Sequence, residues 1–365
     1  MKLSIIIPCY NEAETIATVF DAVARAPLPL GWEKEIIIVD DGSDEATKSA
    51  LKELEAKEGS QALLILHQEK NEGKGAALQV GMRRASGEYL VIQDADMEYD
   101  PGDYQALLAP IIEKKAESVF GSRVLGKNNV PYSAFYFYGG LLTTWLFNLL
   151  FGTRFTDIAT CYKLFDRKKI PALLASHHKD FVFDAVDLTL ALAHSGRVLE
   201  VPISYHARTK HGGKKLNWKH GINIVLMICL ARLGLRSPTQ EKTALQVLRF
   251  LISGTIAAIV NFTTFYVLIS FGNVWYVLAS GLAFLVAFAA SFVMLKYWTF
   301  HSMEVAKIRR QLPLHFTAAF VNLMFNVGIV YFLVAYGHVW PLFSQIAATA
   351  IIAFESFFIF RVIFR

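Results

Sequence analysis

The sequence lacks the features that mark several common protein classes. Its three cysteines, Cys9, Cys161 and Cys229, lie far apart, so they offer neither a disulfide framework nor metal-site spacing, which fits a reducing compartment. The first apolar run, Lys2–Pro8, is too short for a secretory signal. No GxGxxG follows that run and the chain has no GxxxxGK[ST] motif, which argues against a dinucleotide-binding Rossmann domain and a P-loop nucleotide hydrolase.

Charged residues are also scarce and unevenly placed. They make up 18% of the chain, whereas 54% of the residues are hydrophobic and the mean hydropathy is +0.38. Residues 1–130 have the mixed composition of a globular domain, while residues 245–365 are mostly apolar. The net charge of +5 is modest, and we expect no nucleic-acid partner. The composition predicts one globular domain followed by a membrane portion.

The first part of the chain alternates short apolar runs with helical patterns. A helix with apolar residues at helical spacing is expected at Thr15–Arg25, after the first run. This alternation predicts parallel βαβ units and a Rossmann-like three-layer α/β sandwich. The five expected strands are Lys2–Pro8, Glu35–Val39, Ala62–His67, Tyr89–Gln93 and Ser118–Gly121.

Polar residues cluster where four of these strands end. The clusters are Tyr10–Glu12, Asp40–Ser43, Asn71–Gly75 and Asp94–Glu98. Because sheets of this type bind ligands beyond the carboxyl ends of their strands, the clusters predict one shared site.

The last cluster carries the clearest chemistry. Asp94 and Asp96 stand one residue apart directly after a buried strand, and Glu98 follows. Acids this close repel one another, so a cation is expected to offset them. Carboxylate oxygens suit a hard divalent ion, Mg²⁺ or Mn²⁺, with a diphosphate supplying the remaining ligands. The alternative is an acidic turn in water.

Two further apolar segments interrupt the globular pattern. Residues 134–151 contain aromatics, a double glycine and scattered polar residues, which suits either core packing or a helix in the membrane interface. A basic loop, Arg208–Leu216, leads into a second such segment at 217–235. We expect both segments to lie against a bilayer.

Four long apolar segments follow, at about 245–271, 275–295, 312–336 and 340–360. Each is long enough to cross roughly 30 Å of hydrocarbon. Basic residues gather in the connector 296–310 and at the C-terminal end, whereas the other two connectors have none. The positive-inside rule therefore puts both termini and the globular domain in the cytoplasm. Glu355 lies within the last segment, and we expect it to pair with Lys296 or Arg361.

Nine short motifs stand out along the chain. They are PCYNE (8–12), VDDGSDEAT (39–47), NEGKGAAL (71–78), QDADMEYDP (93–101), FGSRV (120–124), TDIATCYKLF (156–165), EVPISY (200–205), GKKL (213–216) and SFVMLKYWTF (291–300). The first five resemble motifs of the inverting, GT-A-fold glycosyltransferases of family two. The next three, with Arg208, resemble the dolichol-phosphate mannose synthase branch and its bacterial polyprenyl-phosphate relatives. The last 121 residues, which contain SFVMLKYWTF, resemble the GtrA-type four-helix membrane domain.

The resemblance implies a domain plan and a reaction. Residues 1–235 would form a cytoplasmic catalytic domain, residues 236–244 a linker and residues 245–365 the membrane domain of a multi-pass protein in the plasma or inner membrane. The enzyme would transfer mannose or glucose from a GDP- or UDP-sugar to a polyprenyl or dolichyl monophosphate, with inversion. Small residues in the spans are compatible with a homo-oligomer.

The resemblance also implies roles for individual residues. Metal ligands would be Asp94, Asp96 and Glu98, although relatives often carry glutamine at the last position. The catalytic set would be Asp96, Arg123, Arg208 and Lys215, in which the basic residues hold phosphates. Nucleotide contacts would come from Pro8, Tyr10, Glu12, Asp40, Asp41, Lys74, Asp94 and Ala95. Family members often place a lipid-gripping arginine near the position of Asn128–Val130, where this chain has none.

Two other functions remain open at this stage. If the acceptor were a sugar hydroxyl, Asp184 or Asp187 would be the candidate general base, with Asp157 as a third spare acid. No QxxRW-like motif typical of many hydroxyl-directed enzymes is evident. Alternatively, the chain could be a glycolipid flippase with a regulatory α/β domain, although an intact acidic cluster argues against this.

Overall fold

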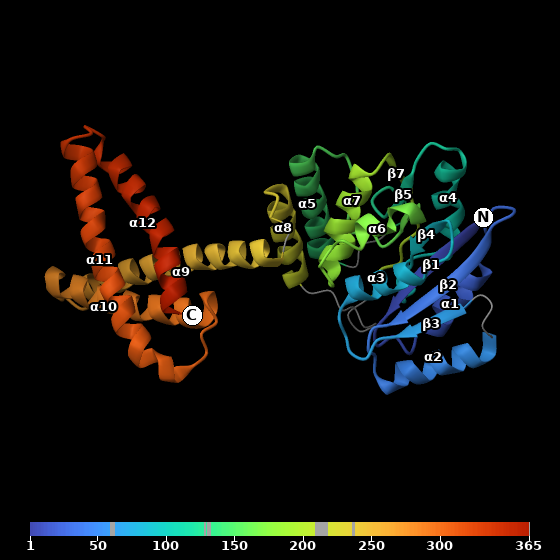
Figure 1. The fold of residues 1–365 in the computed structure, drawn as a ribbon, viewed down its shortest axis with the longest axis horizontal. Coiled ribbons are helices and arrows are strands. Elements are labelled where there is room, and N and C mark those ends of the chain that lie inside the picture. Colours follow the sequence, from blue (N-terminus) through green and yellow to red (C-terminus); the bar gives the residue numbers. More distant parts are fainter. Residues whose placement is uncertain (59–62, 128, 130–132, 209–217, 236–237, 365) are drawn as a thin grey trace. The chain divides into compact units, whose positions relative to one another are not determined.

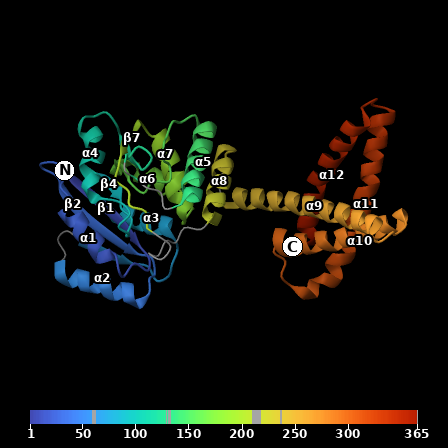
Figure 2. The same cartoon turned by 180° about the vertical axis from the view of Figure 1, so that it is seen from behind.

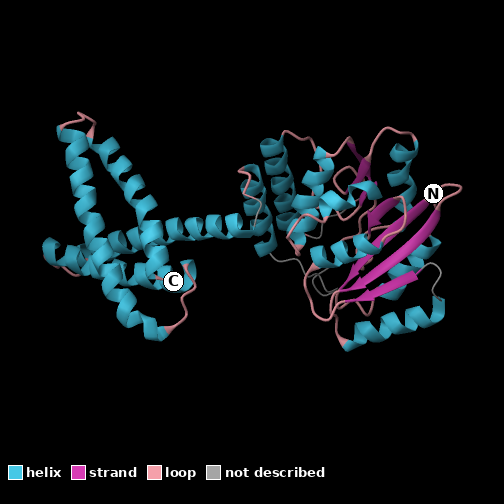
Figure 3. Ribbon diagram, in the orientation of Figure 1, coloured by secondary structure: helices cyan, strands magenta, loops and turns pink. Residues whose placement is uncertain are grey.

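A computed structural model describes residues 1–58, 63–127, 129, 133–208, 218–235 and 238–364. The chain forms two compact units, Met1–Arg236 and Ser237–Arg365, and each is described here by itself. The first unit contains every strand of the described chain, and the second is helical (Figure 3).

A seven-stranded sheet forms the centre of the first unit, in the order β3-β2-β1-β4-β6-β5-β7. Neighbouring strands are parallel except for β6, which is antiparallel to both β4 and β5. The α/β sandwich predicted from the sequence is confirmed, and the reversed strand makes the sheet mixed. The strands are β1 (Lys2–Cys9), β2 (Glu33–Asp40), β3 (Leu63–His67), β4 (Tyr89–Ile92), β5 (Ser118–Ser122), β6 (Lys163–Asp166) and β7 (Val198–Pro202).

Helices cover the sheet because each presents an apolar face to it. In the first helix, α1, the residues Ile16, Val19, Phe20 and Val23 recur at helical spacing and are all buried. Their partners are the nearly continuous apolar runs of β1 and β2. The helices of this unit are α1 (Ile16–Arg25), α2 (Glu45–Glu58), α3 (Lys74–Arg84), α4 (Tyr104–Ile112), α5 (Ala134–Phe151), α6 (Ile170–Leu173), α7 (Thr189–His194) and α8 (Trp218–Arg232), with a π-helical turn at Phe183–Leu188 before α7.

Strand register brings the predicted polar clusters to one edge of the sheet. Cys9 pairs with Asp40, and Asp40 pairs with His67, so β1, β2 and β3 end level with one another. β4 ends beside Ile6 of β1, and its next residue, Gln93, donates its backbone N–H to the Ile6 carbonyl. The loops that follow these four strands therefore start side by side.

Helices α5 and α8 pack side by side in the first unit (Figures 1 and 2). Five large apolar side chains of α5 are 58–68% exposed and recur every three or four residues: Phe135, Tyr138, Leu142, Trp145 and Leu149. The opposite face buries Thr143, Thr144 and Phe147. This is the one-sided pattern expected of a helix that lies in a membrane interface, and α5 is also long and apolar enough to cross a membrane.

The second unit consists of α9 (Pro238–Ser270), α10 (Tyr276–Val293), α11 (Ile308–Ala335) and α12 (Pro341–Ile363). A π-helical turn, Met294–Thr299, extends α10. Within the described residues, Lys242–Ser270, Leu282–Thr299 and Val305–Ala335 of this unit are long and apolar enough to cross a membrane. They overlap three of the four expected spans, and α12 coincides with the fourth.

Residues 238–244 of the expected linker form the first turns of α9, because Pro238 is well suited to a first helical position and the residues after it are compatible with a helix. The linker itself stays a prediction. One expectation for the second unit needs correction. Lys296 does not pair with Glu355. Its ammonium instead reaches the backbone carbonyl of Glu304 and the side chain of Gln311 on α11.

Candidate active site

The two acids after β2 hold the loops of the site together. Asp40 is fully buried; its carboxylate accepts from the Ser43 backbone N–H at 3.0 Å and lies 2.9 Å from His67 Nδ1. Asp41 is 3% exposed and accepts from the backbone N–H groups of Glu72 and Gly73, both at 2.8 Å. Both carboxylates are thus part of the framework that shapes the site, and a contact with a nucleotide base stays a prediction.

The loop after β1 turns outward at Asn11. This residue has a positive φ of 51°, and its side-chain oxygen accepts from the Asp44 backbone N–H at 2.8 Å. Its own N–H donates to Ser43 Oγ at 3.0 Å. The turn leaves Tyr10 at the rim with 38% exposure, whereas Pro8 remains within β1. A contact of the Tyr10 ring with a nucleotide stays a prediction.

Arg208 joins two of the predicted acids across the sheet edge. Its guanidinium lies 3.1 Å from Glu12 Oε2, 3.3 Å from Glu12 Oε1 and 2.6 Å from Asp96 Oδ2. Thr15 Oγ1 supports the same corner by donating to the Ala95 carbonyl at 2.8 Å. The sequence prediction that Arg208 belongs to the site is consistent with this geometry, although its present partners are carboxylates.

A second chain of charges runs inward from Asp94. Lys74 Nζ lies 2.8 Å from Asp94 Oδ1 and 2.8 Å from Asp184 Oδ2. The fully buried Lys163 binds the other oxygen of Asp184 at 2.9 Å. Burial alone would raise the pKa of Asp184, but the charges of Lys163 and Lys74 outweigh it and lower that pKa. Asp184 is therefore held as a charged carboxylate.

Sequence reasoning did not single out Lys163 as a site residue. Lys163 is the first residue of β6 and lies within TDIATCYKLF. A lysine at the start of an otherwise apolar strand is the sequence pattern from which it could have been predicted. A fully buried lysine needs a carboxylate partner, and Asp184 is that partner.

The acidic residues of the cluster lie in two neighbouring groups of charges. Arg208 contacts Glu12, Asp96 and Glu98 in one group, and Lys74 and Lys163 contact Asp94 and Asp184 in the other. Burial, with the charges of Asp94 and Glu98, raises the pKa of Asp96 to about 7, although Arg208 opposes the shift. The oxygen donors of Asp94 and Asp96 fit one hard divalent cation, which would offset their mutual repulsion.

The carboxylate of Glu98, the predicted third metal ligand, accepts hydrogen bonds from the segment that carries Arg208, and its role as a ligand stays a prediction. Its carboxylate accepts from the Tyr205 hydroxyl at 2.6 Å and from the Arg208 backbone N–H at 2.8 Å, while its carbonyl accepts from His206 N–H at 2.8 Å. No group of three His, Cys, Asp or Glu side chains within the described ranges is placed to hold a metal ion. Glu98 fixes the segment that carries Arg208.

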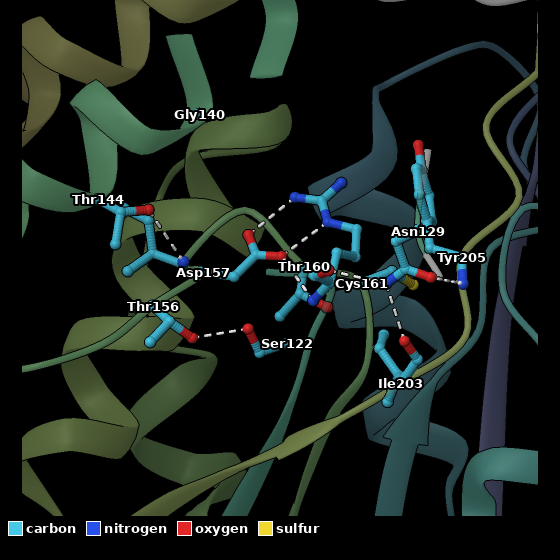
Figure 4. Close-up of polar contacts among 12 residues, drawn as sticks. Ser122, Asn129, Gly140, Thr144, Thr156, Asp157, Thr160, Cys161, Ile203 and Tyr205 are labelled. Carbon is cyan, nitrogen blue, oxygen red and sulfur yellow. Dashed lines mark hydrogen bonds and ion pairs between the residues drawn. The ribbon is translucent and has the colours of Figure 1, made fainter. Parts of the chain in front are cut away.

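Arg123 lies in a separate ion pair with Asp157 (Figure 4). Its Nε and one terminal nitrogen bind the two carboxylate oxygens of Asp157 at 2.7 and 2.8 Å, and its guanidinium lies 5.2 Å from the centre of the Tyr205 ring. Asp157 is therefore not a spare acid, since it fixes Arg123 in a bidentate pair. The other terminal nitrogen of Arg123 is outside this pair.

The surroundings of this pair connect it to α5. Thr144 Oγ1 of α5 accepts from the Ile158 backbone N–H at 3.3 Å, next to Asp157 (Figure 4). Asn129 stands near the position where a lipid-binding arginine was looked for, and its role here is structural. Its side-chain amide donates to the carbonyls of Arg123 and Ile203 at 2.7 and 2.9 Å. Lys215, the last predicted site residue, lies outside the described residues.

Comparisons with known proteins agree with this architecture. Residues 4–168 match the model of the glycosyl transferase family 2, and residues 249–364 match that of the GtrA/DPMS transmembrane domain. The undecaprenyl-phosphate 4-deoxy-4-formamido-L-arabinose transferase of Enterobacter sp. (strain 638) is 27% identical over 282 residues, which cover 75% of this chain and 79% of that protein.

Two solved structures also resemble the chain at lower identity. TarS of S. aureus is 15% identical, with a TM-score of 0.44 and coverage of 87% of each chain. The glucosyl-3-phosphoglycerate synthase of Mycobacterium tuberculosis, crystallised with Mn²⁺ and uridine diphosphate, is 16% identical, with a TM-score of 0.48 and coverage of 65% of this chain and 80% of that one. The two matching models indicate a glycosyl transferase family 2 domain at residues 4–168 and a GtrA/DPMS transmembrane domain at residues 249–364.

Proposed function

We propose that the first unit transfers mannose or glucose from a nucleotide-diphosphate sugar to a polyprenyl or dolichyl monophosphate, with inversion. An acceptor phosphate oxygen attacks the anomeric carbon, the bond from that carbon to the diphosphate breaks, and the nucleoside diphosphate leaves. The product is a polyprenyl-phosphate sugar at the cytoplasmic face of the membrane.

The observation that carries this proposal is the pair of lysines around Asp184. A sugar hydroxyl must lose its proton to a general base as it attacks, whereas a phosphate monoester has a second pKa of about 6 and is already ionised at neutral pH. Asp184 is held between Lys74 and Lys163 at 2.8 and 2.9 Å, so it is a poor proton acceptor. Asp187, the other candidate base, accepts hydrogen bonds from Ser176 and faces His178. Such a site suits an acceptor that is already negatively charged, such as a phosphate monoester.

Two further observations favour a lipid as the carrier of that charge. The exposed apolar stripe of α5, defined above, gives the first unit a surface on which it can rest in the membrane interface. The relative from Enterobacter sp. is named for its undecaprenyl-phosphate substrate. Tethering both enzyme and acceptor to one surface raises their effective concentration.

The diphosphate of the donor would be held by a divalent cation at the acidic cluster and by the basic residues beside it. When bound, Mg²⁺ or Mn²⁺ at Asp94 and Asp96 would supply positive charge to the departing diphosphate. Lys74 and Arg208 pair with the carboxylates of this cluster. Their ammonium and guanidinium groups could exchange these carboxylate partners for phosphate oxygens of the donor. Tyr10 and Glu12 would contact the nucleoside of a GDP- or UDP-sugar, and Arg123 and Lys215 would contact phosphates.

A comparison of acceptors tests this function. Purified full-length protein with GDP-mannose, UDP-glucose and Mn²⁺ or Mg²⁺ is expected to convert undecaprenyl or dolichyl phosphate into a product one hexose heavier, measured by mass spectrometry. The matching polyprenyl alcohol should give no product, because Asp184, a candidate base for its hydroxyl, is held as a carboxylate by two lysines. Transfer to the alcohol at a comparable rate would contradict the proposal, and so would the absence of transfer to any phosphate acceptor from a full donor panel.

A further inference from the structure

The turn that carries Asp157 is held by side chains along its whole length. Four consecutive backbone N–H groups, from Phe155 to Ile158, each donate to a side-chain oxygen. The outer two acceptors belong to α5: Asn148 accepts from Phe155 at 2.9 Å, and Thr144 accepts from Ile158 at 3.3 Å (Figure 4). Most backbone N–H groups bond to other backbone groups, so four side-chain acceptors in a row indicate that the position of this turn is specified.

Glu200 of β7 supplies the two central acceptors. One oxygen of its carboxylate accepts from the Thr156 N–H at 2.7 Å, and the other accepts from the Asp157 N–H at 3.0 Å. Strand β7 lies at the edge of the sheet, where a glutamate usually faces water. Glu200 is instead half-buried, and burial raises its pKa, although the two N–H groups oppose the shift. The place of this carboxylate is therefore explained by the two N–H groups that it holds.

Asp157 in turn fixes both the main chain and the side chain of Arg123. Besides its two contacts with the guanidinium, its carboxylate accepts from the Arg123 backbone N–H at 3.2 Å. A contact of 2.6 Å between the hydroxyls of Ser122 and Thr156 joins the end of β5 to the same turn (Figure 4). Asp157 is only 4% exposed, so it has little freedom to adjust on its own. A displacement of the turn therefore displaces the guanidinium of Arg123.

We propose that Glu200 is a positioning residue, which holds the turn of Asp157 and thereby sets the place of the Arg123 guanidinium. The inference rests on the proposed function, in which Arg123 contacts a phosphate of one of the two substrates. Glu200 contacts neither substrate in this arrangement and acts through Asp157. Such a residue matters because a misplacement of about 1 Å, caused by a change far from the reacting atoms, can reduce the rate about a hundredfold.

Hydrogen exchange of Glu200→Gln in the full-length protein tests the structural half of the proposal. Glutamine has nearly the same volume, but its one carbonyl oxygen replaces two acceptors. The side chain borders a cavity of about 310 Å³, so the amide has room to turn away. Exchange of the Thr156 and Asp157 amides should become at least about tenfold faster, while exchange in β1 and β2 stays the same. Unchanged exchange at the two amides would overturn the proposal. Faster exchange throughout the first unit would also overturn it, because Glu200 would then only stabilise the fold.

Transfer kinetics test the link to Arg123. Glu200→Gln should lower kcat/KM at least about tenfold, and it should raise the KM of the same substrate, donor or acceptor, as Arg123→Gln does. The substrate concerned is the one whose phosphate Arg123 contacts. Because Glu200 acts through Arg123, the double variant should transfer hexose within about twofold of Arg123→Gln alone. Losses that multiply in the double variant, or a rise in the KM of different substrates, would contradict the assignment.

Glu113→Gln is the matched control, because it removes the same charge from an exposed glutamate at the end of α4. It should leave the exchange of the Thr156 and Asp157 amides and the transfer rate within about twofold of the original protein. Equal effects of Glu113→Gln and Glu200→Gln would show that the proposal is wrong. If the original protein transfers no hexose to any phosphate acceptor, the proposed function fails, whereas the exchange experiment still decides whether Glu200 holds the turn.

Discussion

Replacement of Asp96 by alanine is expected to reduce transfer about a thousandfold, the effect of removing a group that stabilises charge in a transition state. Asp96 lies between Arg208 at 2.6 Å and the charges of Asp94 and Glu98. Its loss would remove both a proposed metal ligand and one of the two carboxylates that pair with Arg208. The measurement is the initial rate of labelled hexose transfer to a polyprenyl phosphate in membranes.

The matched control is Asp100→Asn, which neutralises an exposed carboxylate four residues away and keeps an oxygen to accept from the Gly102 N–H. This variant should transfer hexose within twofold of the original protein. If Asp96→Ala transferred hexose within threefold of the original, the acidic cluster would not be the catalytic centre. The α/β domain would then fit a regulatory role better.

Lys163→Met is expected to destabilise the first unit by about 3–5 kcal/mol, because one partner of a buried ion pair disappears. Lys163 is fully buried and donates to the carbonyls of Thr160 and Asp184 and to the Asp184 carboxylate, each at 2.9 Å. Methionine fills the space but donates no hydrogen bond, so all three acceptors lose a donor. Hydrogen exchange of β5 and β6 in the full-length protein measures the loss.

The control for this prediction is Lys48→Met on α2, where an exposed lysine pairs with the neighbouring Glu45. Exposed pairs contribute little to stability, so exchange should not change measurably. Equal exchange in Lys163→Met and the original protein would show that Asp184 does not depend on Lys163. The argument that Asp184 is held as a charged carboxylate would then lose its main support.

The sequence was sufficient to predict the α/β sandwich and the place of its site. Strand ends can be read from apolar runs, and parallel strands bring their carboxyl ends together, as the register of β1, β2 and β4 confirms. The long apolar segments could be predicted equally well from the sequence, because their length and hydropathy are local properties.

Pairings between distant segments could not be predicted in the same way. Arg208 and Asp96 are 112 residues apart in the sequence, and Glu98 and Tyr205 are 107 residues apart. Only the folded chain therefore shows which side chain each carboxylate contacts. Spacing alone cannot tell which way the Glu98 side chain points, so its hydrogen bonds to Tyr205 and Arg208 were not predictable from the sequence. The same reason explains why Asp157 was read as a spare acid before its pairing with Arg123 was known.

The central claim is that the acceptor arrives already ionised, and the pH dependence of kcat/KM for the acceptor tests it most directly. With a polyprenyl phosphate, the rate should rise with pH up to about 6 and then level off, following the second pKa of the acceptor. A phosphonate analogue of the same chain, whose pKa is higher, should move this inflection upward by the same amount. An inflection that stays fixed when the acceptor changes would show that a group of the protein, such as Asp96 with its raised pKa, controls the rate, and it would contradict the account.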